Sequence, residues 1–265
     1  MKTNLTILGG GNLGTAIAQG LATSDVSDQY KITITRRHVS LIKHLEEHGI
    51  CVTNDNRAAV REANLVILAV QPQQLNGLLS EISDQLDANQ HTLISVITGV
   101  KAEDITSQIG STFKVVRAMP NTAIAISQSM TCITSSPHKE ALEQTIRLFD
   151  ALGETLVIDD HLMEAATVLG ACGIAFFLRF IRAASQGGIE VGFHADEAQL
   201  IASQTALGAA SLLLNSEDHP EQAIDRVTTP RGCTIAGLNE MEHNGLSSAL
   251  IKGIKTSYEK IEKIR

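Results

Sequence analysis

GGGNLG, residues 9–14, decides the fold of this chain. It follows a short apolar segment at 3–8 and precedes a segment of helical composition at 15–22. Glycines spaced as G-x-G-x-x-G permit a tight turn between a strand and a helix. They also let backbone N–H groups approach a pyrophosphate at the helix N-terminus. The stretch therefore predicts a dinucleotide-binding strand–helix–strand unit at the start of the chain.

The second strand of this unit is expected at 31–35 (KITIT), and it ends in Arg36 and Arg37. Where such a fold binds NAD, an Asp or Glu usually lies at this point and accepts the ribose 2′-hydroxyl. Guanidinium groups are suited instead to a 2′-phosphate. We therefore expect NADP(H) as the cofactor, with NAD(H) bound at lower preference.

Apolar strand segments alternate with helical segments as far as residue 158. Such alternation predicts an α/β fold, an N-terminal Rossmann domain with a doubly wound, mostly parallel sheet. Further strands are expected at 50–53, 65–70, 92–97, 113–117, 123–126, 130–134 and 154–158, and helices at 40–48, 57–63, 74–86, 102–109 and 137–148.

Beyond residue 160 the sequence pattern is helical only. Apolar residues repeat at helical spacing along one long helix from Leu162 to Ala183. The segment 195–214 is apolar on most faces and must be buried, and little chain is left to cover it. We therefore expect an obligate oligomer, with an NADP-binding Rossmann domain at 1–159 and an all-α dimerisation and substrate domain at 160–265.

Composition argues against several classes of partner. The net charge of −8 and an aromatic content of 3% disfavour nucleic acid and anionic membranes. No apolar run is expected to reach the length of a membrane span, and Met1-Lys2 leads directly into a strand without room for a signal peptide.

The four cysteines form no CxxC pair, which is typical of reduced thiols in the cytoplasm. No metal site is expected, because His44 and His48 fit an exposed helix face better than a ligand pair.

Ligands of doubly wound sheets bind outside the carboxyl ends of the strands. Besides 9–14 and 35–37, the expected strand ends are Ala69-Val70-Gln71-Pro72 and Ile97-Thr98-Gly99. Pro72 and Gly99 either contribute to the site or only terminate their strands. Asn121 either hydrogen-bonds a nicotinamide or forms an Asx turn, and the residues alone favour the turn.

A second informative segment is VTTPRGCTIAGL, residues 227–238. Its Pro, Gly and hydroxyl residues precede a helix, so that free backbone N–H groups should point out of the helix N-terminus. Such a turn binds a carboxylate without any net positive charge, and Arg231 adds a cation to it. The alternative is that Thr229 or Thr234 caps the helix, and the two interpretations are compatible.

The segment GACGIAFFLR, residues 170–179, contains no lysine, which argues against another class of enzyme. A β-hydroxyacid dehydrogenase needs a lysine in this helix to protonate an alkoxide, and none is present. An imine needs no such acid, because its nitrogen can be protonated before hydride arrives. The small residues here equally fit a close contact between helices.

Several motifs together resemble the pyrroline-5-carboxylate reductase family, which makes proline. The resemblance covers essentially the whole chain and includes GGGNLG, AVQP, RAMPNT, GACGIAF, His219-Pro220 and TTPRGCTIAGL. It implies a Rossmann domain followed by a helical domain that interlocks with its twofold mate, in homodimers that assemble further into decamers. It also implies hydride transfer from NADPH to the imine carbon of 1-pyrroline-5-carboxylate, giving L-proline.

The resemblance also implies roles for individual residues. Thr234 matches the catalytic threonine whose hydroxyl hydrogen-bonds the ring nitrogen. Backbone groups at Arg231, Gly232 and Cys233, with Thr229 nearby, would bind the substrate carboxylate, and Glu217 matches an acidic position beside the substrate. The cofactor-binding residues expected from the motif, the strand ends and the resemblance are Gly9, Gly11, Asn12, Leu13, Gly14, Thr35, Arg36, Arg37, Asn56, Ala69, Val70, Gln71, Pro72, Thr98 and Asn121.

The chain departs from the family pattern at three places. It has Arg231 where the family commonly has glycine, which either strengthens carboxylate binding or crowds it. Gln71 stands where lysine is common, and GACGIAF replaces SGSGPAY. Two alternatives therefore remain beside the proline-forming reductase: a related NADP-dependent imine or carbonyl reductase with another substrate, and a non-catalytic NADP-binding module.

Overall fold

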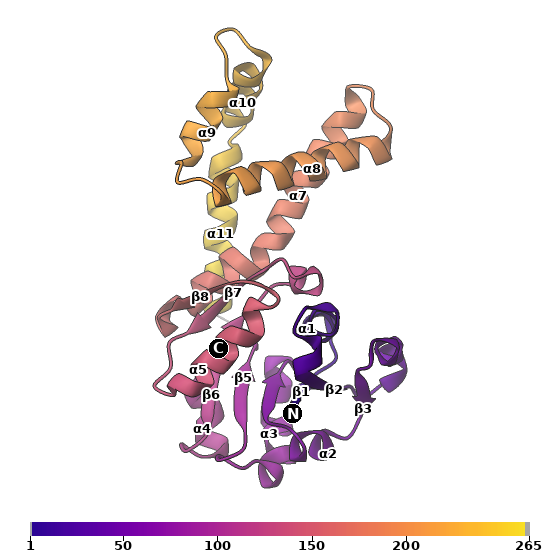
Figure 1. Ribbon diagram of the computed structural model, residues 1–265. Helices are drawn as coiled ribbons and strands as arrows, with labels where there is room; N and C mark the ends of the chain where they lie inside the picture. Colours follow the sequence, from indigo (N-terminus) through magenta and orange to yellow (C-terminus); the bar gives the residue numbers. More distant parts are fainter. Residues whose placement is uncertain (1, 263–265) are drawn as a thin grey trace. The chain divides into compact units, whose positions relative to one another are not determined.

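The computed structural model describes residues 2–262 (Figure 1). The chain divides into two compact units, one formed by Met1–Ile174 with Ser257–Arg265 and the other by Ala175–Thr256. The expected domain boundary at 159/160 stays a prediction, and its outer bounds at 1 and 265 lie outside the described residues. Each unit is described by itself below.

The first unit contains one eight-stranded sheet in the order β3-β2-β1-β4-β5-β6-β7-β8. All neighbouring strands are parallel except β6 and β7, which are antiparallel. The doubly wound, mostly parallel sheet expected from the sequence is confirmed. Its strands are β1 (Thr3–Leu8), β2 (Tyr30–Thr35), β3 (Cys51–Thr53), β4 (Leu65–Leu68), β5 (Thr92–Ser95), β6 (Lys114–Met119), β7 (Ser129–Thr134) and β8 (Gly153–Ile158).

Helices cover both faces of this sheet, which explains why its strands are apolar at nearly every position. Successive side chains of a strand point to opposite faces, and Ile7 and Leu8 are both fully buried. Ile7 belongs to a core with α1 (Asn12–Thr23) and α5 (Lys139–Asp150). Leu8 belongs to a second core on the other face, with α2 (Asn56–Arg61), α3 (Leu75–Ile82) and α4 (Ala102–Ile109).

Three segments of this unit differ from the sequence-based expectation. The strand expected at 123–126 is wrong: Thr122–Ile126 is a 3₁₀ helix, because the Asn121 side chain accepts a hydrogen bond from the Ala123 N–H at 3.0 Å and turns the chain. The helix expected at 40–48 is a pair of 3₁₀ segments. The helix expected at 74–86 is α3 with a 3₁₀ turn at each end.

The remaining elements are helical, and no strand occurs between 160 and 262. The long helix expected from Leu162 onward is confirmed as α6 (Met163–Ala166), a π-helical segment (Thr167–Cys172) and α7 (Gly173–Glu190). It is followed by α8 (Ala195–Leu214), α9 (Pro220–Val227), α10 (Cys233–His243) and α11 (Leu246–Glu262).

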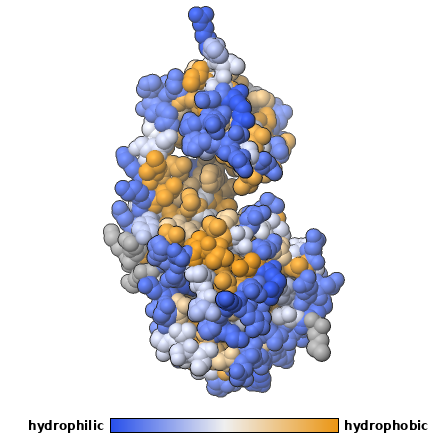
Figure 2. Space-filling view, turned by 60° about the vertical axis from the view of Figure 1, so that its left-hand side comes forward, coloured by the Kyte–Doolittle hydropathy of each residue, from blue (hydrophilic) through white to orange (hydrophobic). Residues whose placement is uncertain are grey.

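Much apolar surface of these helices is uncovered in a single chain. On α8, Leu200 is 69% exposed, Leu212 is 66% exposed and Leu214 is 82% exposed. Figure 2 shows apolar side chains gathered in patches on the face in view. Uncovered leucines at this density are typical of a surface that another molecule buries.

One apolar helix is longer than the sequence analysis allowed. The helical stretch Asp160–Glu190 is long and apolar enough to cross a membrane by length and composition. The expectation that no run reaches this length is therefore wrong, because Arg179 and Arg182 are too few to interrupt the stretch. A mostly buried core helix of a soluble protein meets the same criterion. Here 22% of the apolar window is buried in the single chain, and one such helix does not by itself indicate a membrane.

A buried arginine links the sheet to the first helical turns that follow it. Arg117, at β6, has a side chain that is 3% exposed, and its Nη1 donates to Asp160 Oδ1 at 2.5 Å. Its Nη2 lies 3.7 Å from Oε1 of Glu164, whose side chain is 8% exposed. A buried charge is tolerated when it is paired, and removal of one partner leaves the other uncompensated.

We expect Arg117→Met to lower the free energy of unfolding by about 3 kcal/mol, because Asp160 and Glu164 both lose the buried guanidinium that pairs with them. Denaturant unfolding measures this loss. Arg147→Met is the matched control, since Arg147 and Glu143 form an exposed pair at 3.8 Å and its removal should cost less than about 1 kcal/mol. Equal losses in the two variants would contradict this account.

Candidate functional site

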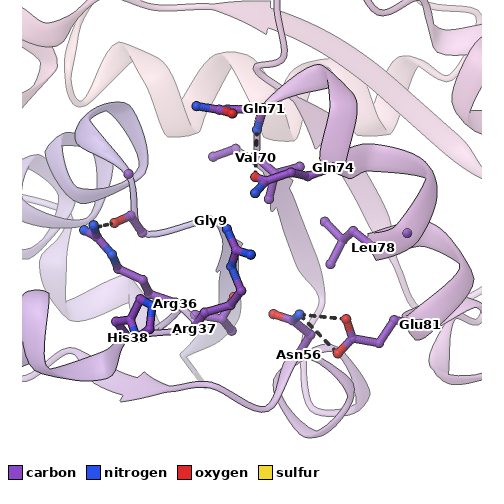
Figure 3. Close-up of a pocket in the computed structure, with 15 residues that line it drawn as sticks. Gly9, Arg36, Arg37, His38, Asn56, Val70, Gln71, Gln74, Leu78 and Glu81 are labelled. Carbon is purple, nitrogen blue, oxygen red and sulfur yellow. Dashed lines mark hydrogen bonds between the residues drawn. The ribbon is translucent and has the colours of Figure 1, made fainter.

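A cavity of about 470 Å³ opens at the carboxyl ends of β1, β2 and β4 (Figure 3). This is the edge of the sheet where doubly wound folds bind their ligands. Most of the expected cofactor-binding residues line it: Gly9, Gly11, Thr35, Arg36, Arg37, Asn56, Ala69, Val70 and Gln71.

The glycines of residues 9–14 serve different steric purposes. Gly9 has a φ of +118°, and a Cβ there would lie 2.5 Å from the Ala69 carbonyl oxygen. A Cβ at Gly14 would overlap the Gly9 carbonyl oxygen. A Cβ at Gly11 would meet nothing within 4 Å. Gly9 and Gly14 thus allow the backbone to pack, whereas Gly11 faces the open space of the cavity.

The two arginines at the end of β2 have different surroundings. Arg36 is half-buried, and its Nη1 donates to the Gly10 carbonyl oxygen at 2.7 Å. The Gly10 N–H in turn donates to the Thr35 carbonyl oxygen at 2.7 Å. Arg37 is exposed and extends into the cavity (Figure 3). Arg36 therefore supports the glycine loop while it also lines the cavity, and Arg37 extends into the cavity without a described hydrogen bond.

The opposite wall of the cavity comes from α3 and the turn before it, which the sequence analysis missed. Asn56 Nδ2 lies 3.1 Å from both carboxylate oxygens of Glu81 (Figure 3). The sequence did carry a signal for this wall. Gln74, Gly77, Leu78 and Glu81 follow the end of β4 at spacings of three and four, so they share one face of a helix. Besides Asn56, the lining residues outside the expected strand ends are His38, Gln74, Gly77, Leu78 and Glu81.

Some expected cofactor residues do not line the cavity: Asn12, Leu13, Gly14, Pro72, Thr98 and Asn121. Asn12, Leu13 and Gly14 form the first turn of α1. The Asx turn at Asn121 is confirmed, since its Oδ1 accepts from the Ala123 N–H and its Nδ2 donates to the Gly170 carbonyl oxygen at 3.4 Å. A nicotinamide contact by Asn121 stays a prediction.

The expected substrate loop lies in the second unit, between α9 and α10. The Gly232 N–H donates to the Thr229 carbonyl oxygen at 2.9 Å and closes a β-turn with Pro230 and Arg231 at its centre. Arg231 has a φ of +62°, and a Cβ at Gly232 would lie 2.6 Å from Thr229 Oγ1. Only glycine fits at 232 without displacing Thr229.

The first turn of α10 has no side-chain partner. Its N-cap is Gly232, no side-chain hydrogen bond caps it, and no acidic residue occurs in its first turn. The alternative that Thr229 or Thr234 caps this helix is therefore wrong. By contrast, α8 begins with the Glu197 carboxylate accepting from the His194 N–H at 3.0 Å. The N-terminus of α10 thus presents free N–H groups and a partial positive charge to solvent.

Thr234 and Glu217 differ in how they relate to this turn. Thr234 is exposed in the first turn of α10, beside the free N–H groups. Glu217 is exposed in the segment between α8 and α9, next to Asp218. Asp218 is paired with Arg226, and this guanidinium holds the pKa of the Asp218 carboxyl below its usual range. No described contact joins Glu217 to the loop, and its role stays a prediction.

Comparison with known protein families gives one match for each of the two parts of the chain. Residues 160–264 match a family model described as pyrroline-5-carboxylate reductase dimerisation. Residues 4–99 match one described as NADP oxidoreductase, coenzyme F420-dependent. The second unit therefore lies within a dimerisation domain, and the glycine loop lies within an NADP oxidoreductase domain.

Whole-chain relatives agree with these matches. Pyrroline-5-carboxylate reductase 2 of Dictyostelium discoideum is 46% identical over 98% of this chain and 92% of its own length. Pyrroline-5-carboxylate reductase 1 of the same organism is 49% identical over 97% of this chain, which spans only 49% of that relative. The crystal structure of Plasmodium falciparum pyrroline carboxylate reductase with NADP bound is 21% identical, with a TM-score of 0.86 over 98% of this chain and 97% of that one. The chain therefore belongs to the pyrroline-5-carboxylate reductase family, whose members are oxidoreductases that act on the pyrroline imine.

Proposed function

We propose that this chain reduces 1-pyrroline-5-carboxylate to L-proline with NADPH, through Thr234 and the N-terminus of α10. The observation that carries the proposal is this uncapped helix start, which places a free threonine hydroxyl beside N–H groups without a partner. These groups together fit an imino acid, whose ring nitrogen and carboxylate are close neighbours. Family membership supports the substrate.

The cavity at the carboxyl edge of the sheet is the proposed cofactor site. The open space over Gly11 leaves room for a pyrophosphate to approach the N-terminus of α1. Arg37 extends into the cavity, where its guanidinium would bind the 2′-phosphate of NADP. The NADP in the Plasmodium falciparum structure supports this assignment. When bound, NADPH supplies the hydride.

At the substrate loop, the residues bind and orient the imine. Free N–H groups of α10, with the backbone of Arg231, Gly232 and Cys233, would hold the carboxylate. The Thr234 hydroxyl would hydrogen-bond the ring nitrogen, which carries the proton while a C–H bond forms at the imine carbon. Because the protonated imine is itself electrophilic, no charged acid is required. Positioning of the two reactants therefore supplies most of the catalysis.

The uncovered apolar faces of the helical part support a homodimer in which a second copy buries them. The exposed leucines of α8 and the apolar helix at Asp160–Glu190 both lie within the segment that matches the dimerisation model. Assembly of dimers into decamers, absence of nucleic-acid and membrane partners, and use of NADH at lower preference are part of the same proposal. A cytoplasmic location is supported by Cys51, Cys132, Cys172 and Cys233, which are all unpaired.

Gly11 and Gly14 should respond differently to the same added methyl group. We expect Gly14→Ala to lower the free energy of unfolding by about 1–3 kcal/mol, because its Cβ overlaps a backbone oxygen. Gly11→Ala should cost less than about 1 kcal/mol, since its φ of −80° suits alanine and its Cβ meets nothing. It should nevertheless weaken NADPH binding at least about tenfold by filling the phosphate space. Denaturant unfolding and fluorescence titration measure the two effects, and normal NADPH binding by Gly11→Ala would refute the site.

Substitution of Arg36 and of Arg37 should have two different effects, one on the support of the glycine loop and one on the preference for NADPH over NADH. We expect Arg37→Ala to weaken NADPH binding by about ten- to a hundredfold and to leave NADH binding unchanged, because only NADPH has the 2′-phosphate. Arg36→Met should weaken both cofactors alike, because it removes the hydrogen bond to the Gly10 carbonyl oxygen. Binding titrations with each cofactor measure this split. A loss confined to NADPH in both variants would show that both arginines bind the phosphate.

Thr234 should be required for reduction and not for folding. We expect Thr234→Ala to lower kcat/KM for pyrroline-5-carboxylate about a hundredfold while its melting temperature stays unchanged, because the hydroxyl has no described partner in the free chain. Thr234→Ser keeps the hydroxyl and should retain most activity. NADPH oxidation measures the rates. Cofactor binding without oxidation by the wild-type protein would instead support a non-catalytic NADP-binding module.

A further inference from the structure

We propose that the Arg231 side chain determines substrate specificity by pairing with the carboxylate of the imino acid. A loop with glycine at this position would bind the carboxylate through its backbone alone. The Arg231 side chain adds a further contact, which selects substrates that carry a carboxylate. The inference rests on the proposed function, because it concerns the same loop and the same substrate.

Arg231 occupies a backbone conformation that glycine normally supplies. The turn closes with the Gly232 N–H donating to the Thr229 carbonyl oxygen, which places Pro230 second and Arg231 third. Proline in the second position and a positive φ in the third are typical of a type II turn, whose third residue is usually Gly or Asn. Arg231 has a φ of +62°, and among the described residues only Ser127 shares a positive φ without being glycine. Its side chain therefore strains this turn.

No described contact within the chain offsets this strain. Arg231 is exposed, and the described residues include no hydrogen-bond or ion-pair partner for its guanidinium. Arg226, five positions earlier in the chain, is by contrast paired with Asp218. We take a strained, exposed side chain without a hydrogen-bond or ion-pair partner in the chain to gain its partner on binding.

The chain segment that contains Arg231 has no acidic residue that would repel an anion. Residues 227–237 contain no Asp or Glu, although the whole chain has a net charge of −8. The next residues begin α10, whose first N–H groups have no side-chain partner. A carboxylate at this turn would meet a guanidinium and helix N–H groups together. A guanidinium binds a carboxylate through two parallel hydrogen bonds, which a neutral ring cannot make.

The ligand class follows from this pairing. Arg231 should favour cyclic imines that carry a carboxylate on the carbon beside nitrogen, and should contribute nothing to 1-pyrroline, which has the same ring and imine without the carboxylate. The opposite possibility, that Arg231 crowds the loop, predicts faster reduction once glycine replaces it.

Steady-state kinetics with both imines tests the proposal in four variants. Arg231→Gly removes both charge and strain, Arg231→Asn removes the charge and suits a positive φ, and Arg231→Lys keeps the charge without the planar fork. Lys139→Asn removes an exposed charge at the start of α5 and is the matched control. Melting temperatures are measured in parallel.

We expect Arg231→Gly and Arg231→Asn to raise the KM for pyrroline-5-carboxylate by about tenfold or more, with a smaller rise in Arg231→Lys. The kcat/KM for 1-pyrroline should stay within about twofold, and the melting temperature of Arg231→Gly should not fall. The KM for pyrroline-5-carboxylate should rise with salt in the wild type and less in Arg231→Gly. Lys139→Asn should change neither KM.

Three results would overturn the inference while leaving the proposed function intact: an unchanged KM in Arg231→Gly, an equal loss with both imines, or faster reduction by Arg231→Gly. The first shows no contact, the second a structural role, and the third crowding. A wild-type protein that reduces no pyrroline-5-carboxylate would overturn the proposed function itself and this inference with it.

Discussion

The close approach of backbone at Gly9 is the constraint on which the N-terminal unit depends. Gly9 packs against the Ala69 carbonyl at the end of β4, and Gly14 packs on the Gly9 carbonyl, so neither position has room for a side chain. This packing brings the ends of β1 and β4 and the start of α1 to one point. Arg36 then fixes the loop through the Gly10 carbonyl oxygen. Gly11 is the glycine of this loop that is not packed against backbone, so the space beside it is open to a ligand.

In the second unit, the proposed substrate loop has to bind an anion although the chain has a net charge of −8. A helix that starts at a glycine, without an acidic residue in its first turn, provides N–H groups for this purpose. In the same unit, α8 and α9 begin with side-chain partners, whereas α10 begins without one. Arg231 adds charge at the cost of backbone strain. Such a site suits the reduction of an imino acid, which requires an oriented ring more than a strong acid.

Much of this was predictable from the sequence, for identifiable physical reasons. Apolar residues at successive positions, such as Ile7 and Leu8, report strands buried on both faces, and the glycine spacing at 9–14 reports where the first helix starts. Sequence patterns indicate which residues are buried and where the backbone requires glycine. They do not indicate which polar atoms form hydrogen bonds with each other. The sequence therefore did not separate Arg36 from Arg37, whose surroundings differ by the hydrogen bond that Arg36 donates to the Gly10 carbonyl oxygen. It likewise missed the 3₁₀ helix at Thr122–Ile126, where a strand was expected, and it missed Glu81, which reaches the cavity only through the packing of α3. The sequence also did not identify Gly232 as the N-cap of α10, because Thr229 and Thr234 lie nearby and threonine is a usual capping residue.

The most direct measurement follows the hydride itself. The purified protein is supplied with pyrroline-5-carboxylate and NADPH that carries deuterium at the transferred position of the nicotinamide, and the product is analysed by mass spectrometry and NMR. The account predicts proline with one deuterium at its δ carbon, the former imine carbon. Unlabelled proline, or oxidation of the cofactor without proline, would contradict it.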